Sequence, residues 1–194
     1  MVFGKAKNAA LQVVKGVDLE RYQGKWYEIA NLPSRFQPKG GKNTTATYTL
    51  QPDGTIHVLN ETWLDGKRAS IEGSAWKVDP NSDEAKLKVR FWLPPFLPLF
   101  PVNGDYWVMV LDSEYRWALV GQPSRNYLWV LSRTPQLSDD VYADLLAHAE
   151  KEGYDVSQVR KTIQDEAADS SNLEVAKKLS DDQGTWWLKS VLGK

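Results

Sequence analysis

Apolar and polar residues alternate between residues 25 and 133, and this pattern predicts an all-β, antiparallel domain. Turn residues such as Pro52-Asp53-Gly54 and Asp79-Pro80-Asn81-Ser82 separate the alternating runs. The runs span residues 25–32, 43–50, 55–64, 67–78, 85–93, 104–112, 115–121 and 126–133. Closure removes the exposed edges of so wide a sheet, so we expect an eight-stranded up-and-down β-barrel. A two-sheet sandwich is the alternative, but it usually needs longer connections.

A helical period follows the last alternating run. Val141, Leu145 and Ala149 recur at intervals of four, behind Ser138, which can cap a helix that continues to Gly153. One apolar face predicts that this helix packs against the outside of the barrel.

Three segments are expected along the chain. Residues 1–16 form an N-terminal extension, residues 17–160 the barrel with its helix, and residues 161–194 a polar tail that ends in an apolar segment containing Trp186 and Trp187. No stretch is apolar for long enough to span a membrane as a helix, and residues 1–17 are too weakly apolar for a secretory signal.

Composition narrows the possible functions. The chain has 194 residues with 24 Lys+Arg against 25 Asp+Glu, a balance that argues against binding nucleic acid. It has no Cys, which excludes disulfides, a thiolate nucleophile and Cys-ligated metals, and only two His, so we expect neither a metal site nor a cofactor. Nine Trp suggest that the protein binds something apolar.

Three motifs carry a family resemblance: Gly24-Lys25-Trp26, Gly104-Asp105-Tyr106 and Arg133. In this order and spacing they resemble the lipocalins. Pro33-Ser34-Arg35-Phe36 and residues 121–129 are most similar to the temperature-induced lipocalins of plants, a group related to the bacterial outer-membrane lipocalins and apolipoprotein D. The resemblance covers about residues 17–155. It implies an eight-stranded barrel that binds a lipid, fatty acid, sterol, isoprenoid or tetrapyrrole, and attachment to membranes from the cytosolic side in protection against thermal and oxidative stress.

The signature residues also have a physical interpretation. In a closed meander, the first strand begins and the eighth ends at one end of the barrel, which we call the floor, so Trp26 and Arg133 become neighbours. The guanidinium can then stack on the indole, a contact of about 0.5–2 kcal/mol. We expect Gly24, Trp26 and Arg133 to be structural.

Alternation also predicts which side chains face the barrel interior. In Lys86-Leu87-Lys88-Val89-Arg90-Phe91 the three apolar residues point inward and the cations outward. Applied to every strand, the same parity gives a predicted cavity lining of Glu28, Ala30, Ala46, Tyr48, Val58, Asn60, Ile71, Ala75, Leu87, Val89, Phe91, Tyr106, Val108, Tyr127 and Trp129. Small residues and a few polar groups among them favour a ligand pocket over a packed core, although a buried Glu28 needs a partner that the sequence does not name.

The two ends of the barrel differ in predicted charge. Connections at 33–42, 65–67, 94–103 and 122–125 share the end opposite the floor, which we call the mouth, and sum to +4 from five cations and Asp65. The floor connections hold six acidic residues and no cation. Asp is common in tight turns, which can account for much of the acidic floor but not for the basic mouth.

A proline-rich apolar run, residues 92–102, belongs to the mouth. Its four prolines predict a stiff irregular loop whose apolar side chains lack a core to enter. The predicted membrane contacts are Trp92, Leu93, Phe96, Leu97, Leu99 and Phe100, with the cations Arg35, Lys39, Lys42 and Lys67. A lid over the pocket or a dimer contact is the alternative.

We therefore expect a carrier or scavenger of a small hydrophobic ligand, cytoplasmic and attached peripherally to membranes, with the plasma membrane favoured, as a monomer or weak homodimer. An enzyme acting in the same cavity is a second hypothesis, but only Glu28, Tyr48 and Tyr106 could do acid–base work and none pairs with a recognisable base. A protein-interaction module that uses the loop and the tail is a third.

Overall fold

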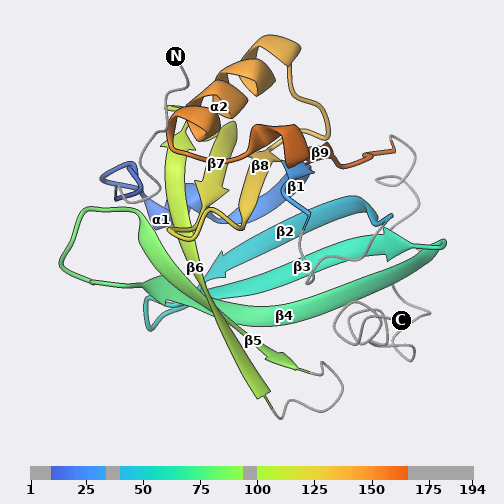
Figure 1. Ribbon diagram of the computed structural model, residues 1–194. Helices are drawn as coiled ribbons and strands as arrows, with labels where there is room; N and C mark the ends of the chain where they lie inside the picture. The colour runs from blue at the N-terminus through green and yellow to red at the C-terminus, as the bar shows by residue number, and fades with distance from the viewer. Residues whose placement is uncertain (1–9, 34–39, 94–99, 166–194) are drawn as a thin grey trace.

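The computed structural model describes residues 10–33, 40–93 and 100–165 (Figure 1). The elements are α1 (Leu19–Tyr22), β1 (Gly24–Asn31), β2 (Lys42–Leu50), β3 (Ile56–Leu64), β4 (Lys67–Lys77), β5 (Lys86–Leu93), β6 (Phe100–Leu111), β7 (Trp117–Gly121), β8 (Leu128–Ser132), α2 (Asp139–Lys151), the 3₁₀ helix η1 (Val156–Gln158) and β9 (Arg160–Lys161).

Strands β1 to β8 form a closed antiparallel barrel. Each strand pairs with the next along the chain from β2 to β8, β8 pairs with β1, and β1 also pairs with β2. The predicted barrel is confirmed, and seven of the eight strands lie within about two residues of their predicted bounds. The exception is β6, which begins at Phe100 instead of residue 104.

The early start of β6 corrects the prediction that residues 92–102 form an irregular loop. Trp92 pairs with Pro101 and Leu93 pairs with Phe100, so β5 and β6 continue as a hairpin to both ends of residues 94–99. Proline is tolerated here because β6 pairs with β7 only from Trp107 onward, which leaves its first half an edge strand.

Both flanking segments contribute to the barrel. Val14 donates to the Val108 carbonyl and accepts from the Ala85 amide, and Leu11 is only 2% exposed. At the other end of the chain, β9 pairs with Ala30 and Asn31 of β1. The part of the chain packed on the barrel is therefore wider than the predicted 17–160.

Two apolar clusters stabilise the fold. One fills the barrel interior and includes Trp26, Tyr48, Val58 and Val108. The other lies between the outside of the barrel and α2, where Leu145 and Ala149 meet residues of β1 and β6 to β8. Figure 1 shows α2 lying over β7 and β8, as its apolar stripe predicted. Ser138 stands at the N-cap without a side-chain capping hydrogen bond.

One strand breaks the predicted alternation. The register of β1 against β8 shifts between Glu28 and Ala30, which is the signature of a β-bulge. The bulge turns Ala30, predicted to line the cavity, to the outside, where it is fully buried in the cluster beneath α2. Alternation alone cannot reveal such an extra residue.

Candidate functional site

The signature residues close the floor of the barrel. The Arg133 guanidinium lies 3.9 Å from the centre of the Trp26 ring, which confirms the predicted cation–π contact. It also donates to the carbonyls of Lys25, Arg21 and Gln23 at 2.9 Å, and to those of Tyr22 and Tyr115. Trp26 is fully buried, and its indole N–H donates to the Tyr22 carbonyl at 2.8 Å.

Gly24 has two reasons to be glycine at this position. Its φ is +94°, a backbone conformation that disfavours any side chain, and a Cβ would lie 3.3 Å from Arg133 Nη1. The glycine thus lets the guanidinium reach the carbonyls of Arg21, Tyr22, Gln23 and Lys25.

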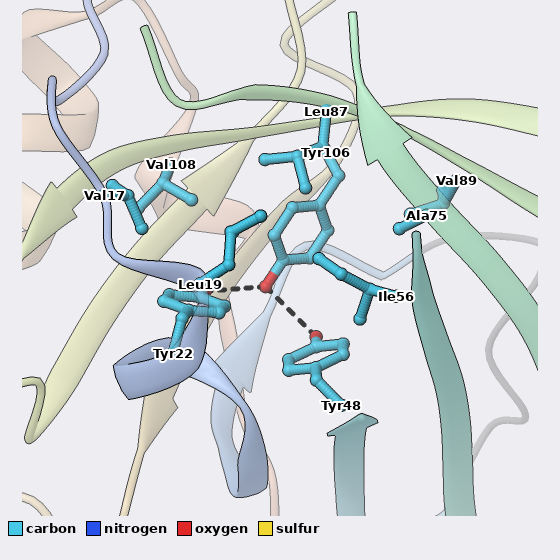
Figure 2. Close-up of a pocket in the computed structure, with 10 residues that line it drawn as sticks. All are labelled: Val17, Leu19, Tyr22, Tyr48, Ile56, Ala75, Leu87, Val89, Tyr106 and Val108. Carbon is cyan, nitrogen blue, oxygen red and sulfur yellow. Dashed lines mark hydrogen bonds between the residues drawn. The ribbon is translucent and has the colours of Figure 1, made fainter. Parts of the chain in front are cut away.

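Three tyrosine hydroxyls form a chain inside the barrel, just above the floor (Figure 2). Tyr106 Oη lies 2.8 Å from Tyr22 Oη and 3.1 Å from Tyr48 Oη. Tyr22 comes from α1, and the other two come from β2 and β6. Burial raises the pKa of Tyr48 to about 12, and burial likewise raises the pKa values of Tyr22 and Tyr106 above their ordinary range. All three hydroxyls therefore stay protonated at neutral pH.

A small cavity adjoins this cluster. It is lined by the three tyrosines and by aliphatic residues: Val17, Leu19, Ile56, Ala75, Leu87, Val89 and Val108. Its volume is about 20 Å³, room for about one water-sized group, whereas pockets for drug-sized ligands measure roughly 300–1,000 Å³. The floor half of the interior is thus packed, and Tyr48, Val58, Ala75, Leu87 and Val108 of the predicted lining are core residues here.

The mouth half of the interior is more open. The strand registers place Asn60 opposite Ile71, Phe91 opposite Gly73 and Trp129 opposite Val120, so these residues share the inner face. Asn60, Ile71, Phe91 and Trp129 are nevertheless partly exposed, and so are Ala46 and Val89 deeper in the barrel. This partial exposure of inward-facing side chains distinguishes the mouth half from the more deeply buried floor half.

Three aromatic side chains shape this open half. Phe91 lies over Gly73, where an added Cβ would come within 2.6 Å of the Phe91 ring and 2.4 Å of the Arg90 carbonyl. Tyr127, which precedes β8, stacks on Trp129 with 6.0 Å between ring centres. Gly73 thus gives the Phe91 ring its place on the wall.

Glu28 has the partners that the sequence did not name. Its Oε1 accepts from Asn31 Nδ2 and Thr162 Oγ1, each at 2.6 Å. Residues 160–165, which we call the strap, continue past β9 between β1 and β2: Thr162 N donates to the Ile29 carbonyl and Asn43 N donates to the Ile163 carbonyl. The buried carboxylate therefore holds the strap across the mouth side of β1.

The outer rim of the mouth carries exposed apolar side chains. Phe100 is 66% exposed and Trp92 is 43% exposed, on paired strands of the β5–β6 hairpin. Lys42 and Lys67 are also exposed. Leu93 is placed by its backbone alone, and the remaining predicted membrane contacts lie outside the described residues: Arg35, Lys39, Phe96, Leu97 and Leu99.

Turn chemistry explains much of the acidic floor. Asp53 accepts from the Thr55 backbone and hydroxyl, Asp79 accepts from the Asn81 amide, and Asp112 binds Arg116 through both carboxylate oxygens. These bonds to Thr55 and Arg116 lower the pKa values of Asp53 and Asp112. At the mouth, Arg125 is likewise engaged, since it donates to the Pro123 and Glu152 carbonyls.

Several residues of the site escaped the sequence prediction. Tyr22 lies on a helix of one turn that no period could reveal, and Thr162 sits in what looked like a polar tail. Their roles depend on long-range contacts. Ile56 could have been found, because it has the same parity as Val58 on β3.

Neither a metal centre nor a spanning helix is found in the described part of the chain. Residues 10–33, 40–93 and 100–165 contain no cluster of three or more His, Asp or Glu side chains suited to a metal ion. Within the same ranges, no helix combines the length and apolar character needed to cross a bilayer.

Comparisons with known proteins agree with the geometry. A sequence family described as "Lipocalin-like domain" matches residues 17–164. Temperature-induced lipocalin-1 of Arabidopsis thaliana is 59% identical over 184 residues, which are 95% of this chain and 97% of that protein. The outer membrane lipoprotein Blc of Escherichia coli K12 is 44% identical over 148 residues, 75% of this chain and 78% of that protein. The structure of insecticyanin from the tobacco hornworm Manduca sexta matches with a TM-score of 0.66 at 23% identity, covering 82% of this chain and 87% of that one, and so has the same fold.

Proposed function

The chain belongs to the lipocalin family, whose members generally bind and transport small hydrophobic ligands, and from this premise we propose that it carries one apolar ligand in the mouth half of the barrel while the β5–β6 hairpin contacts a membrane. The temperature-induced name of its plant relative suggests that this lipid handling serves stress protection.

The observation that carries the proposal is the contrast in exposure inside the barrel. Asn60, Ile71, Phe91 and Trp129 face inward yet stay partly exposed, while most inward residues nearer the floor are buried, among them Tyr48, Val58, Leu87 and Val108. Apolar and aromatic walls with one amide are suited to a lipophile with a single polar group.

Binding is tested by native mass spectrometry of the protein recovered from its own cells. We expect a co-purified apolar molecule that leaves when the protein is denatured. A second arm uses the neutral dye N-phenyl-1-naphthylamine, whose fluorescence should rise on binding. Absence of both a co-purified ligand and dye binding would overturn the proposal.

The proposed membrane contact is supported by the exposed side chains at the outer rim of the mouth. Phe100 and Trp92 expose apolar surface at the same end of the barrel as the exposed cations Lys42 and Lys67, a combination that favours an anionic lipid surface. The outer membrane lipoprotein of E. coli shows that a relative of this chain resides at a membrane. The hairpin then brings the barrel mouth to the bilayer, so that the ligand passes between them without crossing water.

Liposome flotation with vesicles containing phosphatidylserine tests the contact. The Trp92→Asp/Phe100→Asp variant should lose most of its recovery with the vesicles. Val78→Asp is the matched control, because Val78 is 48% exposed but follows β4 at the floor end. Equal recovery of the rim variant and the wild type would contradict membrane contact through this hairpin.

A further inference from the structure

The three-tyrosine cluster has one more proton than its internal hydrogen bonds use. Three hydroxyls carry three protons, and the two contacts, Tyr22 with Tyr106 and Tyr106 with Tyr48, consume two of them. In the described residues the three hydroxyls have no other hydrogen-bond partner. One of the three O–H groups is therefore a donor without an acceptor inside the cluster.

The cavity beside the cluster is where this donor can act. All three tyrosines line it, and the other seven lining residues are aliphatic (Figure 2). Its volume of about 20 Å³ matches a single oxygen-sized group. A buried donor gains most from an acceptor in such a place, because no competing polar group is near and water is scarce.

Burial and an uncharged lining select a neutral acceptor. None of its ten lining residues is charged. The nearest cation in the floor, Arg133, already donates to five backbone carbonyls. Burial is the main cause that raises the pKa of Tyr48, while Glu28 raises it further and Arg133 lowers it, so burial and not the surrounding charge is what disfavours an anion here. An ionised headgroup would be buried there without a partner.

We infer that the tyrosine cavity is a deep subsite of the barrel that binds one neutral oxygen, a hydroxyl or carbonyl, at the leading end of the ligand. This rests on the proposed function and adds an orientation: the oxygen end enters first and the apolar body occupies the mouth half. Ligands of this class are fatty alcohols, ketones, sterols and prenols. An ionised fatty acid binds in the opposite direction, with its carboxylate at the mouth.

The path from the mouth to the subsite runs along successive inward-facing residue pairs of β4 and β5. Phe91 opposite Gly73 belongs to the open half, and the next rung, Val89 opposite Ala75, lines the cavity. Ala75 and Val89 are small, so a linear chain meets little bulk between the two halves.

The test measures displacement of N-phenyl-1-naphthylamine by dodecan-1-ol, 1-chlorododecane and dodecanoate at neutral pH. The variant is Tyr22→Phe/Tyr48→Phe/Tyr106→Phe, which keeps the rings and removes every donor of the cluster. We expect it to weaken dodecan-1-ol binding roughly fivefold, the effect of one net hydrogen bond, and to leave the other two ligands unchanged. Tyr154→Phe is the matched control, since its buried hydroxyl bonds Gln122 outside the barrel interior.

A crystal structure of the wild type with dodecan-1-ol gives a second readout that does not depend on the variant folding. The alcohol oxygen should lie within hydrogen-bond distance of one of the three hydroxyls. An oxygen at the mouth, an unchanged alcohol affinity in the triple variant, or an equal loss for dodecanoate would each overturn the subsite. Failure of all three compounds to displace the dye would instead overturn the binding function itself.

Discussion

The floor and mouth halves of the barrel are built from the same eight strands, yet their inward side chains differ in burial. At the floor, Arg133 stacks on Trp26, and the three tyrosines contact one another through their hydroxyls. At the mouth, Phe91 and Trp129 keep surface that faces the interior and is still exposed. Alternation is alike in both halves, so the difference lies in what covers each end.

The floor is covered by chain from outside the barrel. Residues 14–17 and α1 lie across it, and Arg133 ties the carbonyls of residues 21–25 to the end of β8. The mouth has the β5–β6 hairpin and the strap at its side, neither of which fills the interior. A barrel stabilised chiefly at one end can leave the other end free to bind, and three predictions test this division.

The largest effect is expected at Arg133. Arg133→Ala removes the guanidinium donor from five backbone carbonyls, of which the Tyr22 carbonyl keeps the Trp26 indole N–H, and it removes the contact with Trp26, so we expect the free energy of unfolding to fall by about 3 kcal/mol or more. Urea unfolding followed by tryptophan fluorescence measures it. Lys67→Ala, which removes an exposed cation at the mouth, should change stability by less than about 0.5 kcal/mol. Similar losses for both variants would contradict a floor-centred fold.

High pH should weaken the floor next. Burial raises the pKa of Tyr48 to about 12 in the folded protein, against about 10 for an unfolded chain. Below pH 10 both states keep the proton and the contribution is complete. As pH rises from 10 to 12 the unfolded chain loses protons that the folded protein retains, so stability falls by about 2 kcal/mol from Tyr48 alone.

Urea unfolding at pH 8, 10 and 11 measures this alkaline loss. The Tyr22→Phe/Tyr48→Phe/Tyr106→Phe variant should show a flatter profile, although Tyr154, whose pKa is also about 12, keeps part of the slope. Identical slopes for the two proteins would mean that the cluster is not the source.

The smallest effect is expected at the strap. Thr162→Val removes the hydroxyl that donates to Glu28 Oε1 and should cost about 1 kcal/mol, confined to the mouth. Hydrogen exchange at the Asn43 amide, which donates to the Ile163 carbonyl, should become roughly fivefold faster. Ser157→Ala is the matched control, because it removes a 2.6 Å hydroxyl–carboxylate bond on η1 outside the strap. Faster exchange in both variants, or in neither, would count against a local strap.

Sequence reasoning reached the barrel because period and turn chemistry are local properties. The alternation in Leu87, Val89 and Phe91 fixed the inner face of β5, and spacing alone brought Trp26 to Arg133. It failed at Ala30, where a bulge inserts one residue and reverses the parity that follows. It also predicted too long a proline-rich loop. Proline is allowed at the start of β6 because β7 does not pair there, and the sequence of the loop does not show where β7 pairs.

The sequence by itself determined the closed meander, the outer helix, the floor contact and most of the inward set, since each follows from a repeat or from the order of strands. Only the tertiary structure decided which inward residues are core and which border open space, because that depends on what covers each end. It also gave Glu28 its partner in the strap, 134 positions along the chain. Contacts between such distant segments leave no period in the sequence, and here they separate the buried floor half from the more exposed mouth half.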